Sequence, residues 1–195
     1  MILMKNIIRE GHPTLTKKAQ DVALPLTRAD KQLMLDMIEF VQNSQDPELS
    51  EAYDLRPAVG IAAPQLNISR NIFAVHVHDL DGILYDYVLI NPKMTILDDQ
   101  EIYLPGGEGC LSVDRETEGL TPRFKTVKLE ALRYDYQADI VVPIELIVSG
   151  YVGIVFQHEF DHLEGVMFTD KIFKDLPNAK PAFEIPELEK ETTSD

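Results

Sequence analysis

The clearest hydrophobic repeat in the chain follows the hydroxyl residue Thr27. Together with Asp30, Thr27 provides the cap and the acidic first turn that are typical of a helix start. Apolar side chains then recur at the i, i+3, i+4, i+7 spacing of a helix buried on one side, at Met34, Met37, Ile38 and Val41. The next stretch, residues 43–53, is polar and lacks such a repeat, so we expect a loop there.

Four later runs are rich in β-branched and aromatic residues and predict strands at residues 72–78, 84–90, 127–134 and 141–148. The turn-forming residues 79–82 separate the first two runs, which predicts a hairpin. Because Pro143 cannot donate a backbone hydrogen bond, the last strand is expected at the edge of its sheet.

A further helix is predicted from Ser149, as its cap, to Glu164, with Gly165 ending it. Strands followed by one such helix indicate an α+β fold, with antiparallel β-sheets packed around a central helix. The chain has 195 residues, 45% of them apolar, which is enough for one buried core. We expect one domain over residues 1–175 and a flexible, acidic tail over residues 176–195.

The predicted helix carries the pattern H-E-x-x-H between His158 and His162. Residues four apart lie on one face of a helix, so the two imidazoles can bind one metal ion. Glu159 can then reach a water molecule at that metal and act as a base. The alternative is that these side chains only form a solvated polar face of the helix.

A hydrolytic metal site usually has three protein ligands and one open position. No His or Cys follows His162, so the third ligand is sought upstream. Cys110, the one cysteine of the chain, lies in a glycine-rich loop that lets the backbone turn sharply. A lone cysteine is more often a small buried hydrophobe, but this loop favours a ligand that completes a site of one sulfur and two nitrogens. Residues 111–113 resemble the start of a strand.

Gln65 ends a segment of small residues that begins at Gly60. Pro64 fixes the local path of the backbone, so the glutamine amide can offer an N–H donor to a developing oxyanion. Taken alone, the segment is better explained as a polar turn after an apolar run.

Together, three segments closely resemble the signature motifs of the peptide deformylase family, in the same order: residues 60–65 (GIAAPQ), 108–112 (EGCLS) and 157–162 (QHEFDH). The similarity extends from Ile8 to about residue 173. The first motif of the family commonly has a glycine where this chain has Ala58. Longer segments around 44–56 and 136–143 are similar to the second bacterial subgroup, type 2.

The resemblance implies a metal-dependent hydrolase that removes the N-terminal formyl group from the formylmethionine of newly synthesised polypeptides and releases formate. One divalent metal per chain is implied, Fe2+ in the cell, while Zn2+, Ni2+ or Co2+ can use the same ligands. The implied ligands are Cys110, His158 and His162.

The resemblance also implies roles for residues around the metal. Glu159 transfers the proton, while the Gln65 side chain and the Leu111 backbone N–H bind the oxyanion. The peptide lies as an added strand, and its methionine enters an apolar pocket. The residues implied in substrate binding are Val59, Gly60, Glu108, Gly109, Tyr151, Ile154 and Val155. For the three helix residues, simple core packing explains the pattern nearly as well.

The formal net charge of −15 argues against direct binding to nucleic acid. No apolar run is long enough to predict a membrane span, and the first residues lack the pattern of a signal peptide. A single cysteine fits a reducing compartment, so we expect a cytoplasmic protein. The implied partners are N-formylmethionyl nascent peptides, with transient contact to the ribosome.

Two other classes of protein remain open. A metallopeptidase with the same helix motif would cut internal peptide bonds, although such enzymes often take a ligand downstream of the second histidine. A metal-stabilised binding module would need a closed site with four ligands, and no fourth ligand is evident in the sequence.

Overall fold

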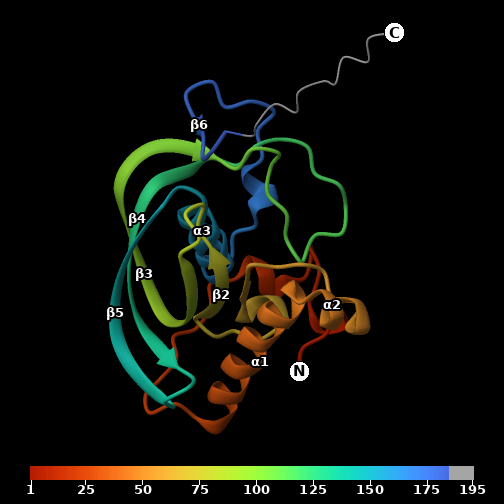
Figure 1. Ribbon diagram of the computed structural model, residues 1–195, viewed down its shortest axis with the longest axis vertical. Helices are drawn as coiled ribbons and strands as arrows, with labels where there is room; N and C mark the ends of the chain where they lie inside the picture. Colours follow the sequence, from red (N-terminus) through yellow and green to blue (C-terminus); the bar gives the residue numbers. More distant parts are fainter. Residues whose placement is uncertain (185–195) are drawn as a thin grey trace.

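The computed structural model describes residues 1–184, and Figure 1 labels its main elements. Its helices are α1 (Arg28–Gln45), α2 (Pro47–Tyr53) and α3 (Gly150–Glu164), with short 3-10 turns η1 (Met4–Asn6), η2 (Pro13–Thr16), η3 (Ala63–Leu66) and η4 (Phe168–Lys171). Its strands are β1 (Gly60–Ala62), β2 (Ile72–His78), β3 (Leu84–Tyr103), β4 (Arg123–Asp135), β5 (Ile140–Ser149) and β6 (Lys180–Pro181). The predicted α+β fold is confirmed. None of the helices formed by the described residues is both long and apolar enough to span a membrane.

The strands join into one sheet, whereas the sequence suggested more than one. Strands β1 to β5 lie in chain order, each antiparallel to the next, and β6 pairs in parallel with the end of β3. The long strands β3, β4 and β5 curve around α3 (Figure 1). β5 is the last strand in this order, so Pro143 lies on an edge strand, as predicted.

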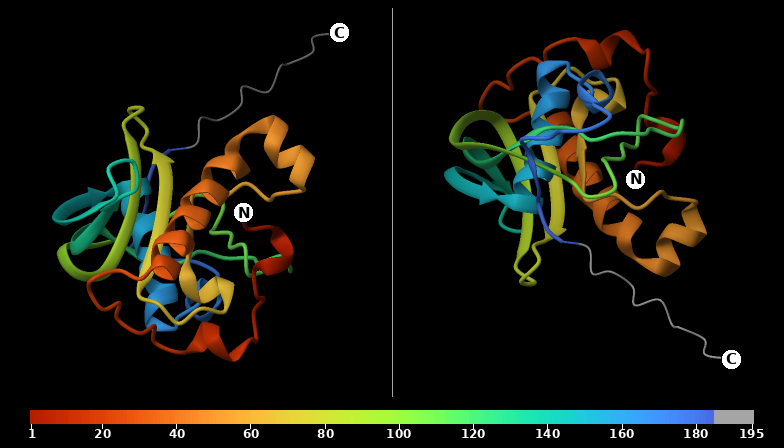
Figure 2. Two further views of the ribbon diagram at one scale, coloured as in Figure 1. Left: turned by 90° about the horizontal axis from the view of Figure 1, so that it is seen from below. Right: turned by 90° about the horizontal axis from the view of Figure 1, so that it is seen from above.

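Side chains of β2 alternate between two cores. Ile72 and Ala74 pack into the core that contains the buried face of α1. Phe73 and Val75 pack into the core formed with α3. Figure 2 shows α1 and α3 on opposite sides of the sheet. Because both faces of β2 are covered there, its first four residues, Ile72 to Val75, are all apolar and buried rather than alternating. The sheet thus separates α1 from the motif-bearing helix α3.

Strand β3 continues well beyond the predicted end at Ile90, to Tyr103. Its register with β4 shifts between Ile90 and Lys93, where Pro92 lies. A proline lacks the N–H that a regular ladder needs, and such a shift leaves it unpaired. This irregularity and the mixed exposure of the later residues conceal the strand in the sequence.

The loop predicted at residues 43–53 is wrong. α1 extends to Gln45, and α2 starts two residues later. The side chain of Asp46 caps α2 by accepting the backbone N–H groups of Glu48 and Leu49, at 2.9 and 3.0 Å. No residue of α2 is buried, so this helix has no hydrophobic repeat by which to recognise it.

The predicted bounds of α3 are correct, but its N-terminal cap differs. Ser149 occupies the cap position without a side-chain hydrogen bond to the helix. Its hydroxyl lies 3.0 Å from that of Thr126 on β4 instead. Gly165 ends the helix with φ of 75°. A Cβ at Gly165 would lie 2.7 Å from the backbone of Lys17. Both the positive φ and the lack of space therefore favour glycine at this position.

We predicted a flexible tail from residue 176 onward, and the structure describes contacts between part of that segment and the preceding residues. Lys180 and Pro181 form β6 against β3, and the Ala182 N–H donates to the carbonyl of Tyr103 at 2.8 Å. The ring of Phe183 contacts Tyr151 of α3. Residues 180–183 therefore pack against β3 and α3, while residues 185–195 of the predicted tail lie outside the described residues.

Candidate active site

Cys110, His158 and His162 come together at one point beside the middle of α3. Their potential ligand atoms all lie within 4.8 Å of one another. The sulfur of Cys110 is 3.3 Å from Nε2 of His162. The two histidines occupy successive turns of α3, and the loop between β3 and β4 brings the cysteine to them. Such convergence from distant segments is what a metal site requires.

Charge in this cluster is arranged to favour a thiolate. Burial raises the pKa of the Cys110 thiol, but the positive charge of His162 and hydrogen bonds with both imidazoles outweigh burial and hold that pKa well below its usual value. Burial lowers the pKa of His158, yet hydrogen bonds to Cys110 and Glu108 raise it well above the usual value. A buried thiolate beside two imidazoles is a donor set that suits zinc, iron and other transition metals.

Two buried polar atoms of the site lack a protein partner among the described residues: Oε2 of Glu159 and Nδ1 of His162. Buried polar groups rarely remain without a hydrogen bond. Since the free carboxylate oxygen of Glu159 belongs to a residue that lines the cavity described below, it is available to a water molecule or substrate there. The donor set and these free atoms together fit a divalent metal.

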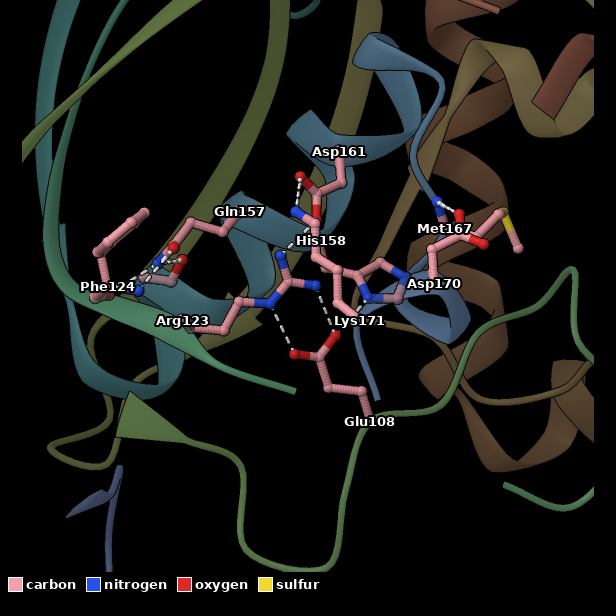
Figure 3. Close-up of polar contacts among 10 residues, drawn as sticks. Glu108, Arg123, Phe124, Gln157, His158, Asp161, Met167, Asp170 and Lys171 are labelled. Carbon is pink, nitrogen blue, oxygen red and sulfur yellow. Dashed lines mark hydrogen bonds and ion pairs between the residues drawn. The ribbon is translucent and has the colours of Figure 1, made fainter. Parts of the chain in front are cut away.

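A buried ion pair holds His158 in place (Figure 3). Nδ1 of His158 lies 2.8 Å from Oε2 of Glu108, which leaves its Nε2 for the site. Arg123, only 2% exposed, donates to both oxygens of Glu108 at 2.7 and 2.8 Å. Burial raises the pKa of Glu108, but these partners outweigh it and lower the pKa to about 2. The carboxylate is thus charged and fixed behind the imidazole.

The same arginine continues into a second ion pair. Nη1 of Arg123 donates to Asp161 at 2.5 Å, and Nζ of Lys171 lies 2.9 Å from both oxygens of that carboxylate (Figure 3). Asp161 lies between the two histidines on α3, so the network ties the motif helix to β4 and η4. Sequence reasoning missed this network, because only the fold brings β4 to the helix.

Glu108 was predicted to bind substrate, and the structure places it in the wall of the cavity with its carboxylate turned to protein partners. Its atoms reach the wall of the cavity, but both carboxylate oxygens are already bound by Arg123 and His158. The neighbouring Gly109 is exposed and also lines the cavity. Glu108 therefore orients a candidate ligand, and Gly109 is the free backbone next to it.

Gln65 is buried with its amide in a defined orientation. Its Oε1 accepts the N–H of Ala62 at 2.8 Å. Its Nε2 therefore faces Cys110, with the sulfur 3.5 Å away and the hydroxyl of Ser112 3.3 Å away. An N–H donor is thus held next to the candidate metal site.

Residues 111–113, predicted to begin a strand, form a turn instead. The N–H of Val113 donates to the carbonyl of Cys110 at 3.1 Å, which closes the turn. Arg56 donates to the carbonyls of Cys110 and Val113, at 3.0 and 3.2 Å. These contacts hold Leu111 in the wall of the cavity, and sequence reasoning assigned no role to Arg56.

Glu159 is buried and packs directly against Gly60. An ideal Cβ on Gly60 would lie 2.6 Å from Oε1 of Glu159, so a side chain there has no room. Burial raises the pKa of Glu159 to about 7. The carboxyl can therefore bind or release a proton near neutral pH. Ala58, where the family commonly has glycine, is not among the residues with positive φ and is accommodated without backbone strain.

A cavity of about 370 Å³ opens onto these groups, within the range that small-molecule sites occupy. Every site residue predicted from the sequence lines this cavity except His162, which is buried beside it. Its apolar wall comes from Val59 and from three residues on one face of α3, namely Tyr151, Ile154 and Val155.

Comparison with known proteins agrees with this geometry. The family model described as polypeptide deformylase matches residues 4–177. The chain is 49% identical to the peptide deformylase of Oceanobacillus iheyensis over 187 residues, which cover 96% of this chain and 97% of that protein. It is also 49% identical to peptide deformylase 2 of Bacillus subtilis over 181 residues, 93% and 96% of the two chains. That name agrees with the predicted second bacterial subgroup.

Solved structures lead to the same family. A class I type b peptide deformylase from Acinetobacter baumannii aligns with a TM-score of 0.65 and 26% identity, over 88% of this chain and 99% of that one. The peptide deformylase of Thermotoga maritima aligns with a TM-score of 0.60 and 31% identity, over 86% and 96%. This chain therefore belongs to the polypeptide deformylase family, whose members are hydrolases that remove N-formyl groups from nascent peptides.

Proposed function

We propose that this chain hydrolyses the formyl amide of N-formylmethionyl nascent peptides and releases formate, with one divalent metal held by Cys110, His158 and His162. The observation that carries the proposal is the convergence of these three ligand atoms, within 4.8 Å of one another, beside the buried carboxyl of Glu159. Fe2+ is the metal we propose in the cell, and Zn2+, Ni2+ and Co2+ suit the same donors. When bound, the metal supplies positive charge that lowers the pKa of a neighbouring water molecule and polarises the formyl carbonyl.

Glu159 is proposed as the group that moves the proton. Its pKa of about 7 lets the carboxylate accept a proton from water and later give it to the leaving amine. Its position against Gly60, in the wall of the cavity, fixes where that exchange takes place. Such acid–base help typically contributes about 10²–10⁴-fold to a rate.

Gln65 and Leu111 are proposed to stabilise the oxyanion that forms when the formyl carbon becomes tetrahedral. The side-chain N–H of Gln65 is aimed into the site because its oxygen is bound to Ala62. The backbone N–H of Leu111 would be the second donor, on the turn that Arg56 holds. Donors fixed in advance need little rearrangement as charge develops.

The peptide is proposed to bind along the free edge of β1. β1 is the first strand in the sheet order, so its outer edge has no strand partner among the described residues. Residues Val59 and Gly60 would pair with the peptide backbone, next to Gly109 on the opposite loop. The methionine side chain would then enter the apolar part of the cavity, near Tyr151, Ile154 and Val155.

The substrate also suggests where the protein works. Formylated nascent chains are made by ribosomes, so we propose a cytoplasmic enzyme that meets them in transient contact with the ribosome. With a net charge of −15, the chain is poorly suited to bind ribosomal RNA directly. We therefore expect the nascent peptide itself to supply most of the binding energy.

An assay of two peptides tests the proposal. Anaerobically purified protein, with its metal content measured, is incubated with formyl-Met-Ala-Ser and with a longer unformylated peptide. We expect stoichiometric release of formate from the first peptide and no cleavage of the second. Cleavage of internal bonds would instead identify a metallopeptidase, and a metal-replete protein inactive on both would indicate a binding module.

A further inference from the structure

The last described segment of the chain returns to the active-site cavity. We call residues 178–183 the C-terminal strap. Its β6 pairs with the end of β3, Lys180 opposite Ile102 and Pro181 opposite Tyr103. The N–H of Ala182 adds a hydrogen bond of 2.8 Å to the carbonyl of Tyr103. Figure 1 shows β6 beside the end of β3.

The strap contacts one residue of the cavity wall, Tyr151, and one residue next to the wall, Tyr103. Leu104 lines the cavity and directly follows Tyr103, to which the strap is bonded. Beyond β6, the ring of Phe183 meets the ring of Tyr151 edge to face, with centroids 6.2 Å apart and planes at 88°. Tyr151 is itself one of the apolar wall residues on α3. The strap thus links the end of β3, next to the wall residue Leu104, to the wall residue Tyr151.

The position of Tyr151 depends on packing. Among the described residues, its hydroxyl has no hydrogen-bond partner, and burial is the one cause that raises its pKa. Tyr151 is the second residue of α3 and directly follows Gly150, whose φ is 58°. With no polar anchor, the ring takes its orientation from its neighbours, and Phe183 is the aromatic one.

We propose that Phe183 is a positioning residue that sets the selectivity of the cavity for a long apolar side chain on the first residue of the substrate. The inference rests on the proposed function. A long side chain such as that of methionine reaches the Tyr151 wall, whereas that of alanine does not. If the ring of Tyr151 is released, contact is lost for the long side chain alone. Selectivity then falls while the chemical step, several residues away along α3, is unchanged.

Kinetics with two peptides test this role. Formyl-Met-Ala-Ser and formyl-Ala-Ala-Ser are compared, using kcat and KM for each with metal-loaded wild type and Phe183→Ala. We expect the ratio of kcat/KM values, Met over Ala, to fall about 3–10-fold, the range that one edge-to-face aromatic contact supports. The fall should come from a higher KM for the methionine peptide, with its kcat within about twofold.

Matched variants separate positioning from general damage. Phe183→Tyr keeps the ring and should retain the wild-type ratio, while Glu184→Ala, at the exposed neighbouring position, should also leave it unchanged. In a Tyr151→Leu background, Phe183→Ala should have no further effect, because the residue through which it acts is gone. Melting temperature and metal content are recorded for every variant.

Two results would overturn the inference: an unchanged Met/Ala ratio in Phe183→Ala, with or without equal losses for both peptides, or the same effect of Phe183→Ala in the wild-type and Tyr151→Leu backgrounds. Neither of these would touch the proposed function, which fails only if the wild-type protein does not release formate from formyl-Met-Ala-Ser.

Discussion

Gly60 and Glu159 pack so closely that the glutamate side chain leaves no room for a side chain at residue 60. An added Cβ at residue 60 would lie 2.6–2.8 Å from three atoms of the glutamate side chain, including Oε1. Real Cβ atoms do not approach so closely, so one of the two residues would have to move. The glycine of the first motif thus sets the position of the carboxyl in the third motif.

The variant Gly60→Ala should therefore displace Glu159 and slow the reaction. A misplacement of about 1 Å costs up to about 10²-fold in rate, and we expect kcat to fall by that order while metal content is unchanged. Ala58→Gly, two residues earlier in the same segment, makes no new contact and should stay within about twofold of wild type. Near-native turnover of Gly60→Ala would show that the carboxyl position is not critical.

Replacing the carboxyl itself, in Glu159→Gln, should retain the metal, because the ligand set is untouched. Proton transfer should be lost, and kcat should fall about 10²–10⁴-fold. Metal analysis and turnover measured on the same preparation check both parts. A metal-replete variant with near-native turnover would contradict the role assigned to Glu159.

Cys110→Ser distinguishes a ligand from a buried hydrophobe. An alcohol is a poor ligand at neutral pH, so metal stoichiometry should fall well below one per chain and most activity should be lost. The iron-loaded wild type should also lose activity in air faster than a nickel- or zinc-loaded form, because thiolate and Fe2+ are both oxidisable. An active Cys110→Ser protein with full metal content would overturn the whole ligand assignment.

Arg123→Ala should be strongly destabilising. It leaves two carboxylates, Glu108 and Asp161, without their buried partner, at a cost of about 3–5 kcal/mol. For a chain of this length, that corresponds to a fall in melting temperature of about 6–20 °C. Lys171→Ala removes a partner of the same Asp161, but this lysine is 38% exposed and should cost less than about 1 kcal/mol. Equal losses in the two variants would contradict the importance of the buried pair.

The carboxyl of Asp30, which is not part of the candidate active site, should make the stability of the folded state depend on pH. Burial raises the pKa of this carboxyl, but hydrogen bonds from Thr27 and Arg70 outweigh burial and lower it below 3.8. The folded state therefore binds fewer protons than the unfolded state, so this contribution is present above pH 3.8 and is lost as pH falls through the lower folded-state value. Melting temperatures of wild type and Asp30→Asn, compared at each pH, should differ by about 2–8 °C at pH 7. The difference should shrink below about pH 4, and a constant difference would contradict the assignment.

The cluster of Cys110, His158 and His162, our proposed metal ligands, could be predicted from the sequence because its signals are local or unique. His158 and His162 are four residues apart on one helix, and Cys110 is the one cysteine of the chain. Imidazole and thiol groups at such positions have few roles other than metal binding, so few alternative interpretations compete. The strands β2, β4 and β5 were found because their runs of β-branched and aromatic residues are also local signals.

Features that depend on tertiary contact could not be predicted in this way. Arg123 looks like an ordinary start of a strand until the fold places it between Glu108 and Asp161. α2 buries no side chain and so has no hydrophobic repeat. Residues 180–183 are charged, proline-containing or isolated apolar positions, and they pair only because β3 extends far enough to meet them.

The order of the sheet has a consequence for how a new copy of this protein is made. Because β1 to β5 neighbour one another in the order of synthesis, each strand can pair with one that has already left the ribosome. β6 also pairs with an earlier strand, but that strand is β3 rather than the one made just before it, and β4, β5 and α3 lie between them in the chain. We expect the catalytic cluster to assemble before β6 emerges. A nascent copy would then acquire its chemistry first and its preference for methionine last.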